Sequence, residues 1–459
     1  MTSPFTDHAE GATPLRPVTK AAFTTWKDSA TPSERRWLDT TGFSAETGSL
    51  AFLPGKAGGL KRVLLGLGDG SDPWAFGAPS KALPSGTYRY EGLRGADKSR
   101  WAALAWGLGA YTFTRYKTAA TPKTPAVLVW PKGVDPTEIT RLVEATHLVR
   151  DLINTPAEDM GPSELVNAAK DLATRYGAGL NIIDGLDLER GFPAIHAVGK
   201  GSPRAPRLID LTWGRADAPK LTLVGKGVCF DSGGLGLKPD TAMKLMKKDM
   251  GGAAHVLGLA RMILDAKLPV RLRVLIPAVE NAVSGNAMRP LDIIRTRRGT
   301  TVEIGHTDAE GRLILADALT LAGEDHPDLV VDLATLTGAA RTALGTDIPP
   351  LFTNDEALAR DLLAAAKAEN DPLWRLPLWA PYRSLLDSTT ADISNVSDAP
   401  FAGAITAALF LKEFAAESRA WVHLDVYAWN KSGRAGRPEG GEAQGLRALF
   451  SLLRRRYEK

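Results

Sequence analysis

Hydrophobic residues in the second half of the chain gather into short, nearly continuous runs. These runs predict buried strands at residues 205–213, 219–227, 270–279, 328–336 and 420–428. Continuous apolar runs are typical of central strands in parallel or mixed sheets, which are covered on both faces. Apolar residues at helical spacing predict helices at 251–266 and 311–324. The alternation predicts a three-layer α/β fold with a mixed sheet, in which ligands bind beyond the carboxyl ends of the strands.

The first half of the chain shows a weaker pattern of the same kind. About the first 20 residues are polar and are expected to be loose. Strands are expected at 48–54, 61–70 and 124–131, and helices at 100–117 and 136–156. We therefore predict a smaller N-terminal α/β domain (1–135), a linker helix region (136–160) and a larger C-terminal domain (161–459).

Composition narrows the classes of protein that fit this pattern. The net charge is only +4 over 459 residues, which gives no electrostatic case for binding nucleic acid or a membrane surface. The single cysteine, Cys229, excludes an intrachain disulfide framework and fits a reducing compartment. No apolar run approaches the roughly 18 to 20 residues of a membrane helix, and the first residues do not resemble a signal peptide. A cytoplasmic protein is expected, ending in a helix whose basic tail, 454–459, is solvated.

Four carboxylates stand in glycine-rich turns at the predicted ends of strands: Asp231, Asp249, Asp308 and Glu310. Each alone could be a turn former or a helix cap. Brought together without partners, they would repel one another and lose hydration, whereas two divalent cations would neutralise them. Oxygen ligands without Cys or His suit Mg, Mn or Zn, and a metal pair can activate water for hydrolysis. A phosphate loop is rejected, because "GKG" at 225–227 lacks the required spacing of Gly, Lys and Ser or Thr.

Several separate stretches, in order, resemble the leucine aminopeptidase family, the hexameric two-metal cytosol aminopeptidases. The most specific are "VGKGVCFDSGG", "KKDMGGAA" and "TDAEGRLILADAL", supported by "RDLINTPAEDMGPSEL", "ENAVSGNAMRPLDI", "DLATLTGA" and "AGAITAALFLKEF". The resemblance extends from about Arg150 to Pro438, and it is loose in the N-terminal part. It implies that the C-terminal domain is a peptidase and that the chain forms a homohexamer. The expected substrates are short peptides with a free N-terminus.

The resemblance also implies the ligands of the metals. One ion would be held by Asp231, Asp308 and Glu310, with the backbone carbonyl of Asp308. The second would be held by Lys226, Asp231, Asp249 and Glu310, with Asp231 and Glu310 bridging. A lysine can be a ligand only as the neutral amine, and two adjacent cations would lower its pKa to allow this. Zn or Mn is expected, and Mg or Co would also fit.

Further roles follow from the same resemblance. Lys238 would polarise the scissile carbonyl, and Arg312 would hold a bicarbonate ion that acts as general base. Asp308, Glu310 and Arg312 alternate, which in an extended backbone would place them on one side. The substrate would be contacted by Met246, Thr335, the backbone N–H of Leu336, Gly338 and Tyr427.

The chain departs from the family pattern at two positions. His306 stands where the family usually has Asn; it either replaces the hydrogen bonds of that amide or takes part directly in metal binding or proton transfer. Tyr427 stands where the family usually has a small residue, so it either narrows the substrate pocket or faces the core. His255 and His423 lie in apolar periodic contexts and are expected in the core or an interface.

Two alternatives to a broad aminopeptidase stay open. One is a dipeptidase of narrow specificity, for example for Cys-Gly, that uses the same site. The other is a DNA-binding role, against which the nearly balanced charge argues.

Overall fold

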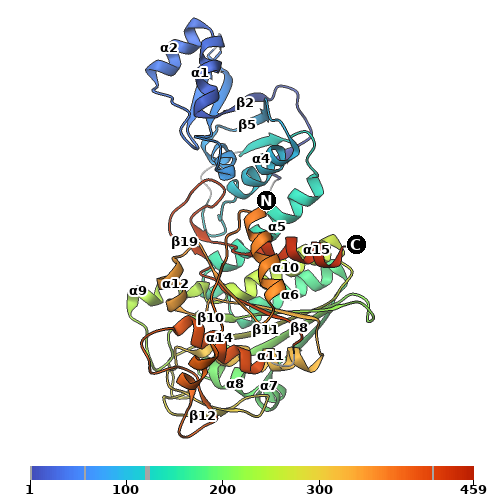
Figure 1. The fold of residues 1–459 in the computed structure, drawn as a ribbon, viewed down its shortest axis with the longest axis vertical. Coiled ribbons are helices and arrows are strands. Elements are labelled where there is room, and N and C mark those ends of the chain that lie inside the picture. Colours follow the sequence, from blue (N-terminus) through green and yellow to red (C-terminus); the bar gives the residue numbers. More distant parts are fainter. Residues whose placement is uncertain (1–2, 56–57, 119–124, 416–417, 459) are drawn as a thin grey trace. The chain divides into compact units, whose positions relative to one another are not determined.

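A computed structural model describes residues 3–55, 58–118, 125–415 and 418–458 (Figure 1). The chain forms two compact units, one of Met1–His147 with Asn430–Gly440, and one of Leu148–Trp429 with Gly441–Lys459. The division falls inside α5 (Pro136–Asn154), the helix that the sequence predicts at 136–156. The predicted domain boundaries stay a prediction. They do not include the second segment, Asn430–Gly440, that the structure assigns to the N-terminal unit.

The N-terminal unit is built on a six-stranded sheet of order β1-β6-β5-β2-β4-β3. Its strands are parallel except for β3, which runs antiparallel to β4. The strands are β1 (Phe5–Thr6), β2 (Thr13–Val18), β3 (Leu50–Pro54), β4 (Leu60–Gly66), β5 (Gly86–Tyr90) and β6 (Ala126–Val129). The helices are α1 (Lys20–Ser29), α2 (Pro32–Thr40), α3 (Pro79–Ala82) and α4 (Ala96–Gly109), with the 3-10 turn η1 (Pro73–Gly77).

Two expectations for this unit are wrong. The first residues are not loose: β2 lies inside the sheet with Leu15 fully buried, and Phe5 of β1 stacks on Trp130 with ring centroids 4.0 Å apart. Tertiary packing therefore overrides their polar composition. The helix expected at 100–117 is α4, which begins earlier and ends at Gly109.

The larger unit contains a nine-stranded mixed sheet of order β16-β15-β18-β14-β9-β11-β8-β7, with β10 paired to β11. Four neighbouring central strands, β18, β14, β9 and β11, run parallel. β8 is antiparallel to β11 and β7, and β15 is antiparallel to β18 but parallel to β16. The strands are β7 (Gly179–Ile183), β8 (Arg207–Trp213), β9 (Lys220–Gly225), β10 (Gly227–Asp231), β11 (Arg271–Asn281), β14 (Leu329–Ala334), β15 (Pro350–Thr353), β16 (Trp374–Arg375) and β18 (Trp421–Asp425). All five strands predicted here are confirmed, although the run at 219–227 divides between β9 and β10.

Helices cover both faces of this sheet, which confirms the three-layer α/β fold. Figure 1 shows α10, α6 and α15 on one side of the sheet and α11, α8 and α14 on the other. The helices are α6 (Pro162–Tyr176), α7 (Gly185–Gly191), α8 (Pro193–Gly199), α9 (Asp240–Met243), α10 (Gly251–Ala266), α11 (Glu310–Glu324), α12 (Gly338–Leu344), α13 (Glu356–Ala368), α14 (Gly403–Phe414) and α15 (Leu446–Tyr457). Shorter elements are η2 (Ala157–Asp159), η3 (Met246–Lys248), η4 (Ala380–Leu386), the sheet of β12 (Ile293–Arg295), β13 (Thr301–Glu303) and β17 (Ile393–Ser394), and the pair β19 (Trp429–Asn430) and β20 (Gly440–Gly441).

Close backbone packing brings α10 against the carboxyl ends of the central strands. A β-carbon at Gly252 would lie 2.0 Å from the carbonyl oxygen of Leu333 in β14, so only glycine fits there. The predicted helices at 251–266 and 311–324 are confirmed as α10 and α11, and α15 ends in exposed arginines as expected. Among the described residues, no helix combines the length and apolar composition that a membrane span requires.

Candidate metal centre

Lys226 and Asp231 come from the connection between two central strands. Lys226 follows β9; its N–H donates to Leu333 O at 3.0 Å and its carbonyl accepts the N–H of Ala253 at 2.8 Å. Asp231 ends β10 and is buried, and its Oδ1 accepts the N–H of Gly233 at 2.8 Å. Both side chains are thus placed at the carboxyl ends of the strands, where the fold predicts a ligand site.

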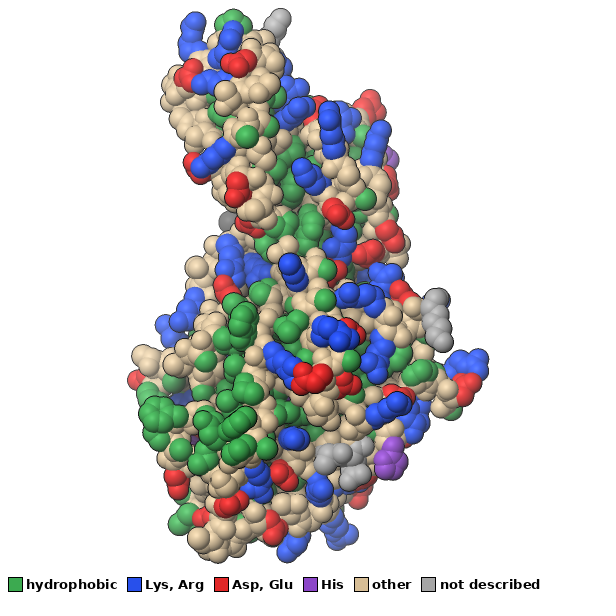
Figure 2. Space-filling model, viewed as in Figure 1, with side chains coloured by type: hydrophobic (Ala, Val, Ile, Leu, Met, Phe, Trp, Pro, Cys, Tyr) green, Lys and Arg blue, Asp and Glu red, His purple; other side chains and the backbone are tan. Residues whose placement is uncertain are grey.

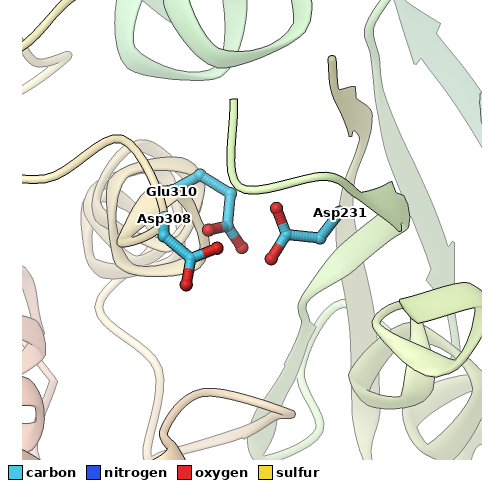
Figure 3. A group of neighbouring side chains, drawn as sticks. All are labelled: Asp231, Asp308 and Glu310. Atoms are coloured by element: carbon cyan, nitrogen blue, oxygen red, sulfur yellow. The ribbon is translucent and has the colours of Figure 1, made fainter. Parts of the chain in front are cut away.

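Asp308 and Glu310 approach Asp231 from the turn that opens α11. One carboxylate oxygen from each of the three residues lies within 4.8 Å of the others, and Figure 3 shows the three side chains converging. Glu310 is 1 % exposed and Asp231 is 2 % exposed. Asp249 is outside this group of three and reaches it through Lys226.

The expectation that Asp308, Glu310 and Arg312 alternate along an extended backbone is wrong. Glu310 is the first residue of α11 and Arg312 lies in its first turn, after an N-cap at Ala309. Residues two apart in a helix point in different directions. Glu310 therefore faces Lys226, whereas the Arg312 guanidinium lies 5.9 Å from the ring centroid of Phe410.

Two lysines bridge the carboxylates. The Nζ of Lys226 lies 2.8 Å from both Asp249 Oδ2 and Glu310 Oε1, and it donates to Thr335 O at 3.0 Å. The Nζ of Lys238 lies 2.8 Å from Asp231 Oδ2 and 2.5 Å from an oxygen of Asp308. All the ligand residues predicted from the sequence, together with Lys238, therefore meet in one cluster, in which Lys226, Asp231, Asp249 and Glu310 are buried and Asp308 and Lys238 are half-buried.

The charges in this cluster perturb one another strongly. Burial and the neighbouring carboxylates raise the pKa of Glu310 to about 8 and that of Asp231 to about 6. Burial opposes the charged form of Lys226, but Asp249, Glu310 and Asp231 outweigh it and raise its pKa. Two ammonium groups facing four carboxylates leave an excess of negative charge.

The donor set fits divalent cations. Among the described residues, the oxygens Asp249 Oδ2, Asp308 Oδ1 and Glu310 Oε1 have only the ammonium groups of Lys226 and Lys238 as partners, which leaves a lone pair on each for a cation. Buried carboxylates with unfilled acceptor sites and excess negative charge are the environment that hard or borderline cations prefer.

Arg312 is buried with part of its donor capacity unused. Its Nη1 donates to the carbonyl of Asn395 at 2.5 Å, while its buried Nε has no hydrogen-bond partner among the described residues. Burial lowers the pKa of Arg312 to about 10, although Glu310 and Asp425 act in the opposite direction. A guanidinium with a free donor can bind an anion.

The predicted substrate residues are only partly available to a ligand. Thr335 donates its hydroxyl to Asp249 Oδ1 at 2.8 Å, so it lies at the centre. Gly338, at the start of α12, is exposed, and a β-carbon there would meet nothing within 4 Å. The N–H of Leu336 already donates to Asp425 Oδ1 at 2.9 Å, so a substrate could not use it without breaking this bond.

Tyr427 carries two cations on its ring. It is half-buried just beyond β18, with Lys248 Nζ 4.6 Å and Arg341 Cζ 5.8 Å from the ring centroid. Burial lowers the pKa of Lys248 to about 8, although the adjacent Asp249 raises it. Met246 is half-buried in η3, two residues before Lys248. Whether Tyr427 lines a substrate pocket stays a prediction.

The histidines divide as the sequence predicts. His255 is fully buried in α10; its Nδ1–H donates to Gly251 O at 2.6 Å and its Nε2 accepts the N–H of Gln444 at 2.9 Å. His423 is buried in β18, 2.5 Å from Asp332. His306 is exposed, and its Nδ1 accepts the N–H of Asp308 at 3.0 Å. This bond occupies the Nδ1 lone pair, so Nδ1 is not a metal ligand in this arrangement.

Sequence reasoning missed two buried asparagines that hold the centre together. Asn281 ends β11 and donates from Nδ2 to Asp231 Oδ1 at 2.9 Å and to Thr307 O at 3.0 Å. Asn395 follows β17 and contacts the turn before α11. Asn281 lies within the family-like stretch "ENAVSGNAMRPLDI", which was the only available signal; Asn395 had none.

Comparisons with known proteins agree with this geometry. The family described as "Cytosol aminopeptidase family, catalytic domain" matches residues 147–450, and "M17 aminopeptidase, N-terminal domain" matches residues 13–131. The chain belongs to the cytosol aminopeptidase family. Accordingly, it is a metal-dependent aminopeptidase.

Individual members of the cytosol aminopeptidase family are similar over most of the chain. A probable cytosol aminopeptidase of Geobacter sulfurreducens is 42% identical over 377 residues, which cover 78% of this chain and 76% of the relative. The crystal structure of a cytosol aminopeptidase from Coxiella burnetii has a TM-score of 0.94 and 48% identity, covering 98% of each chain. The bottromycin maturation enzyme BotP in complex with Mn has a TM-score of 0.86 and 36% identity, covering 96% of this chain and 99% of that one.

Proposed function

We propose that the cluster binds two divalent metal ions and hydrolyses the N-terminal peptide bond of short peptides. Asp231, Asp308 and Glu310 would hold one ion, with the carbonyl of Asp308, and Lys226, Asp231, Asp249 and Glu310 the other. The observation that carries this proposal is the convergence of three carboxylates within 4.8 Å, beside a fourth that shares Lys226. Divalent cations at such a site lower the pKa of water and polarise a carbonyl.

The chemistry of the donors supports Zn or Mn, with Mg or Co as alternatives. Four carboxylates and one amine make a donor set of mostly oxygen, which suits these ions. The manganese in the BotP complex adds support for Mn. The free α-amine of a peptide would also bind at the metals, which would restrict cleavage to the N-terminal residue.

Lys238 and Arg312 would supply the two further groups that the reaction needs. The ammonium of Lys238 would donate to the oxygen of the scissile carbonyl, whose negative charge grows as the bond breaks. The unpaired Nε of Arg312 would hold a bicarbonate ion as the general base. These roles rest on the family resemblance and on the positions of the two side chains.

The pocket for the first side chain of the substrate would be lined by Met246, Thr335, Gly338 and Tyr427. The open space beside Gly338 supports this assignment. We leave the N–H of Leu336 out of the proposal because Asp425 occupies it. A narrow dipeptidase, for example for Cys-Gly, would use the same centre with a smaller pocket, and the bulk of Tyr427 is the observation that favours it.

The proposal extends to assembly and location. The family resemblance supports a homohexamer, and the names of the relatives support a cytoplasmic location. The apolar side chains that the larger unit exposes also support a protein interface; they include Leu237, Trp374, Trp379 and Phe401. Nothing in the charge of +4 supports a role in DNA binding.

Metal removal followed by stepwise return tests the proposal. The full-length protein is stripped with a chelator, and Zn or Mn is returned while hydrolysis of aminoacyl and dipeptide substrates is measured. We expect no activity without metal and full activity at two ions per chain, counted by native mass spectrometry. Saturation at one ion, or activity that survives chelation, would contradict it.

The same substrate panel separates the two specificities. We expect the enzyme to cleave tripeptides with a free N-terminus. We expect no cleavage of N-blocked peptides, because binding requires the free amine. An enzyme that cleaves only dipeptides would support the narrow dipeptidase instead.

A further inference from the structure

A single buried asparagine holds the turn that carries Asp308 and Glu310. Asn395 is fully buried and comes from a segment 90 residues along the chain from Gly305. Its Oδ1 accepts the N–H groups of Gly305 at 2.8 Å and His306 at 3.2 Å. Its Nδ2 donates to the carbonyls of His306 at 2.9 Å and Ala309 at 3.4 Å. The amide thus uses its entire hydrogen-bonding capacity on one short turn.

The backbone of Asn395 fixes the segments on both sides of this turn. Its N–H donates to the carbonyl of Glu303 in β13, which precedes the turn, at 2.9 Å. Its carbonyl accepts the Nη1 of Arg312, which follows the turn in α11, at 2.5 Å. One residue therefore contacts the entry to the turn, the turn itself and Arg312.

The turn needs an external support of this kind. The N-terminus of α11 has no side-chain cap, so its first turn depends on contacts from elsewhere in the chain. The turn packs closely on the segment that follows β17: a β-carbon at Gly305 would lie 2.6 Å from Val396 Cγ2. Removing the Asn395 amide would take four hydrogen bonds from the turn. Among the described residues, the N–H of Gly305 would keep only the carbonyl of Glu303, at 3.2 Å, and the carbonyl of His306 only the N–H of Ala309, at 3.2 Å, so the turn would be free to move.

We propose that Asn395 is a positioning residue of the metal centre, which sets the distance of Asp308 and Glu310 from Asp231 and orients Arg312. This inference rests on the proposed metal site. Residues that hydrogen-bond around metal ligands typically change metal affinity by 10–100-fold when they are removed. Because Asn395 holds the Asp308 side of the centre, its loss weakens the ion bound by Asp308 more than the ion bound by Asp249.

The affinity of the full-length protein for Co²⁺ tests this inference without substrate. The two dissociation constants are measured by competition with a chelator, and the visible spectrum reports the geometry of the bound ion. In Asn395→Ala we expect the dissociation constant of the ion bound by Asp308 to rise about 10–100-fold with a changed spectrum, and that of the other ion, which shares Glu310, to rise less. Asn354→Ala is the control, since among the described residues the exposed Asn354 amide accepts the N–H of Trp421, at 2.9 Å, and makes no contact with the turn. It should bind both ions as the wild type does.

Thermal unfolding separates positioning from a general loss of stability. A purely structural role would lower the melting temperature of the metal-free and the loaded protein equally. A positioning role also reduces the rise in melting temperature that metal produces, because that rise depends on affinity. If Asn395→Ala does not fold, Asn395→Ser, which keeps a polar group in the same space, is judged by the same thresholds.

The outcomes distinguish this inference from the proposed function. Wild-type affinity and spectrum in Asn395→Ala, or an equal fall of both melting temperatures, would overturn the positioning role while leaving the two-metal centre standing. A wild-type protein that binds fewer than two ions would instead overturn the proposed function.

Discussion

Lys226 reaches Asp249 and Glu310 because the residue after Glu310 has no side chain. A β-carbon at Gly311 would lie 2.6 Å from Lys226 Cε and 2.7 Å from its Nζ. Glycine near the start of a helix costs about 1 kcal/mol relative to alanine. Gly311 therefore makes α11 less stable than alanine would, but it leaves the space that the Lys226 side chain occupies.

Replacing Lys238 should impair the chemical step and spare the metals. In Lys238→Ala we expect kcat to fall by roughly 10² to 10³, as for the loss of one donor to a developing oxyanion. Metal content should stay at two ions, because the ammonium only pairs with Asp231 and Asp308. Steady-state kinetics with metal analysis measure both. The control is Lys244→Ala, which replaces an exposed lysine in the same stretch. If kcat of Lys238→Ala decreased by less than about tenfold, Lys238 would not have the proposed role.

Tyr427 should set the size of the preferred N-terminal residue. If its ring fills the pocket, a leucyl side chain would be overpacked by roughly 1 to 3 kcal/mol, so an alanyl substrate should match or exceed the leucyl one in kcat/KM. Tyr427→Ala should shift the ratio toward leucine by about tenfold or more, whereas Tyr427→Phe should leave it unchanged. A wild-type enzyme that prefers leucyl substrate tenfold would show that the ring faces elsewhere.

The sequence revealed the charged residues of the centre but not the residues that orient them. Asp231, Asp249, Asp308 and Glu310 were found because four carboxylates in glycine-rich turns at strand ends are unusual together, and because the stretches that carry them resemble the cytosol aminopeptidase family. Asn395 could not be found, since its role depends on a contact with a turn 90 residues away. The direction of Arg312 was wrong because the alternation of residues 308–312 was taken into the helix predicted at 311–324, where residues two apart point in different directions.

At the scale of single elements, α2 is held by a capping box that depends on charge. Glu34 accepts the N–H of Thr31 at 2.9 Å and pairs with Lys61 at 2.9 Å. Burial raises its pKa, but Lys61 and Thr31 outweigh this and lower it from 4.5 to about 2. A lowered pKa stabilises the fold above pH 4.5, and the contribution is lost as pH falls toward 2.

Glu34→Gln should therefore destabilise the protein in a pH-dependent way. At pH 7 we expect a loss of about 1 kcal/mol, as is typical for a helix cap, measured by urea denaturation. The difference from wild type should stay constant down to about pH 5 and narrow below it. Glu46→Gln is the control, since the Glu46 pair with Lys20 is exposed and contributes little. A difference that does not vary between pH 7 and pH 3 would show that the charge of Glu34 is not involved.

Elements were predictable where the pattern and the burial agree. The central strands β9, β11, β14 and β18 are covered on both faces, so their continuous apolar runs identified them. In the N-terminal unit β2 carries two prolines and alternates weakly, and it belongs to the sheet only through its neighbours β4 and β5. Such a strand has no local signal.

At the scale of the whole molecule, the proposed metal ligands all belong to one chain and one unit, Leu148–Trp429. Assembly is therefore not needed to complete the set of ligands. Exposed apolar side chains are nevertheless candidates for the interface of the proposed hexamer: Phe401 is 80% exposed and Trp374 is 60% exposed. Figure 2 shows hydrophobic side chains gathered over the region where Figure 1 places α9 and α14.

Light scattering at micromolar concentration should therefore give six times the mass of the chain, the hexamer that the family resemblance implies. Trp374→Glu and Phe401→Glu should reduce the assembled fraction if this surface is the interface, because a buried unpaired charge opposes association. Since each chain carries the full set of ligands, the dissociated variants should still bind two metal ions. A wild-type protein with the mass of a single chain would refute the hexamer, whereas loss of metal on dissociation would show that the centre needs a neighbouring chain.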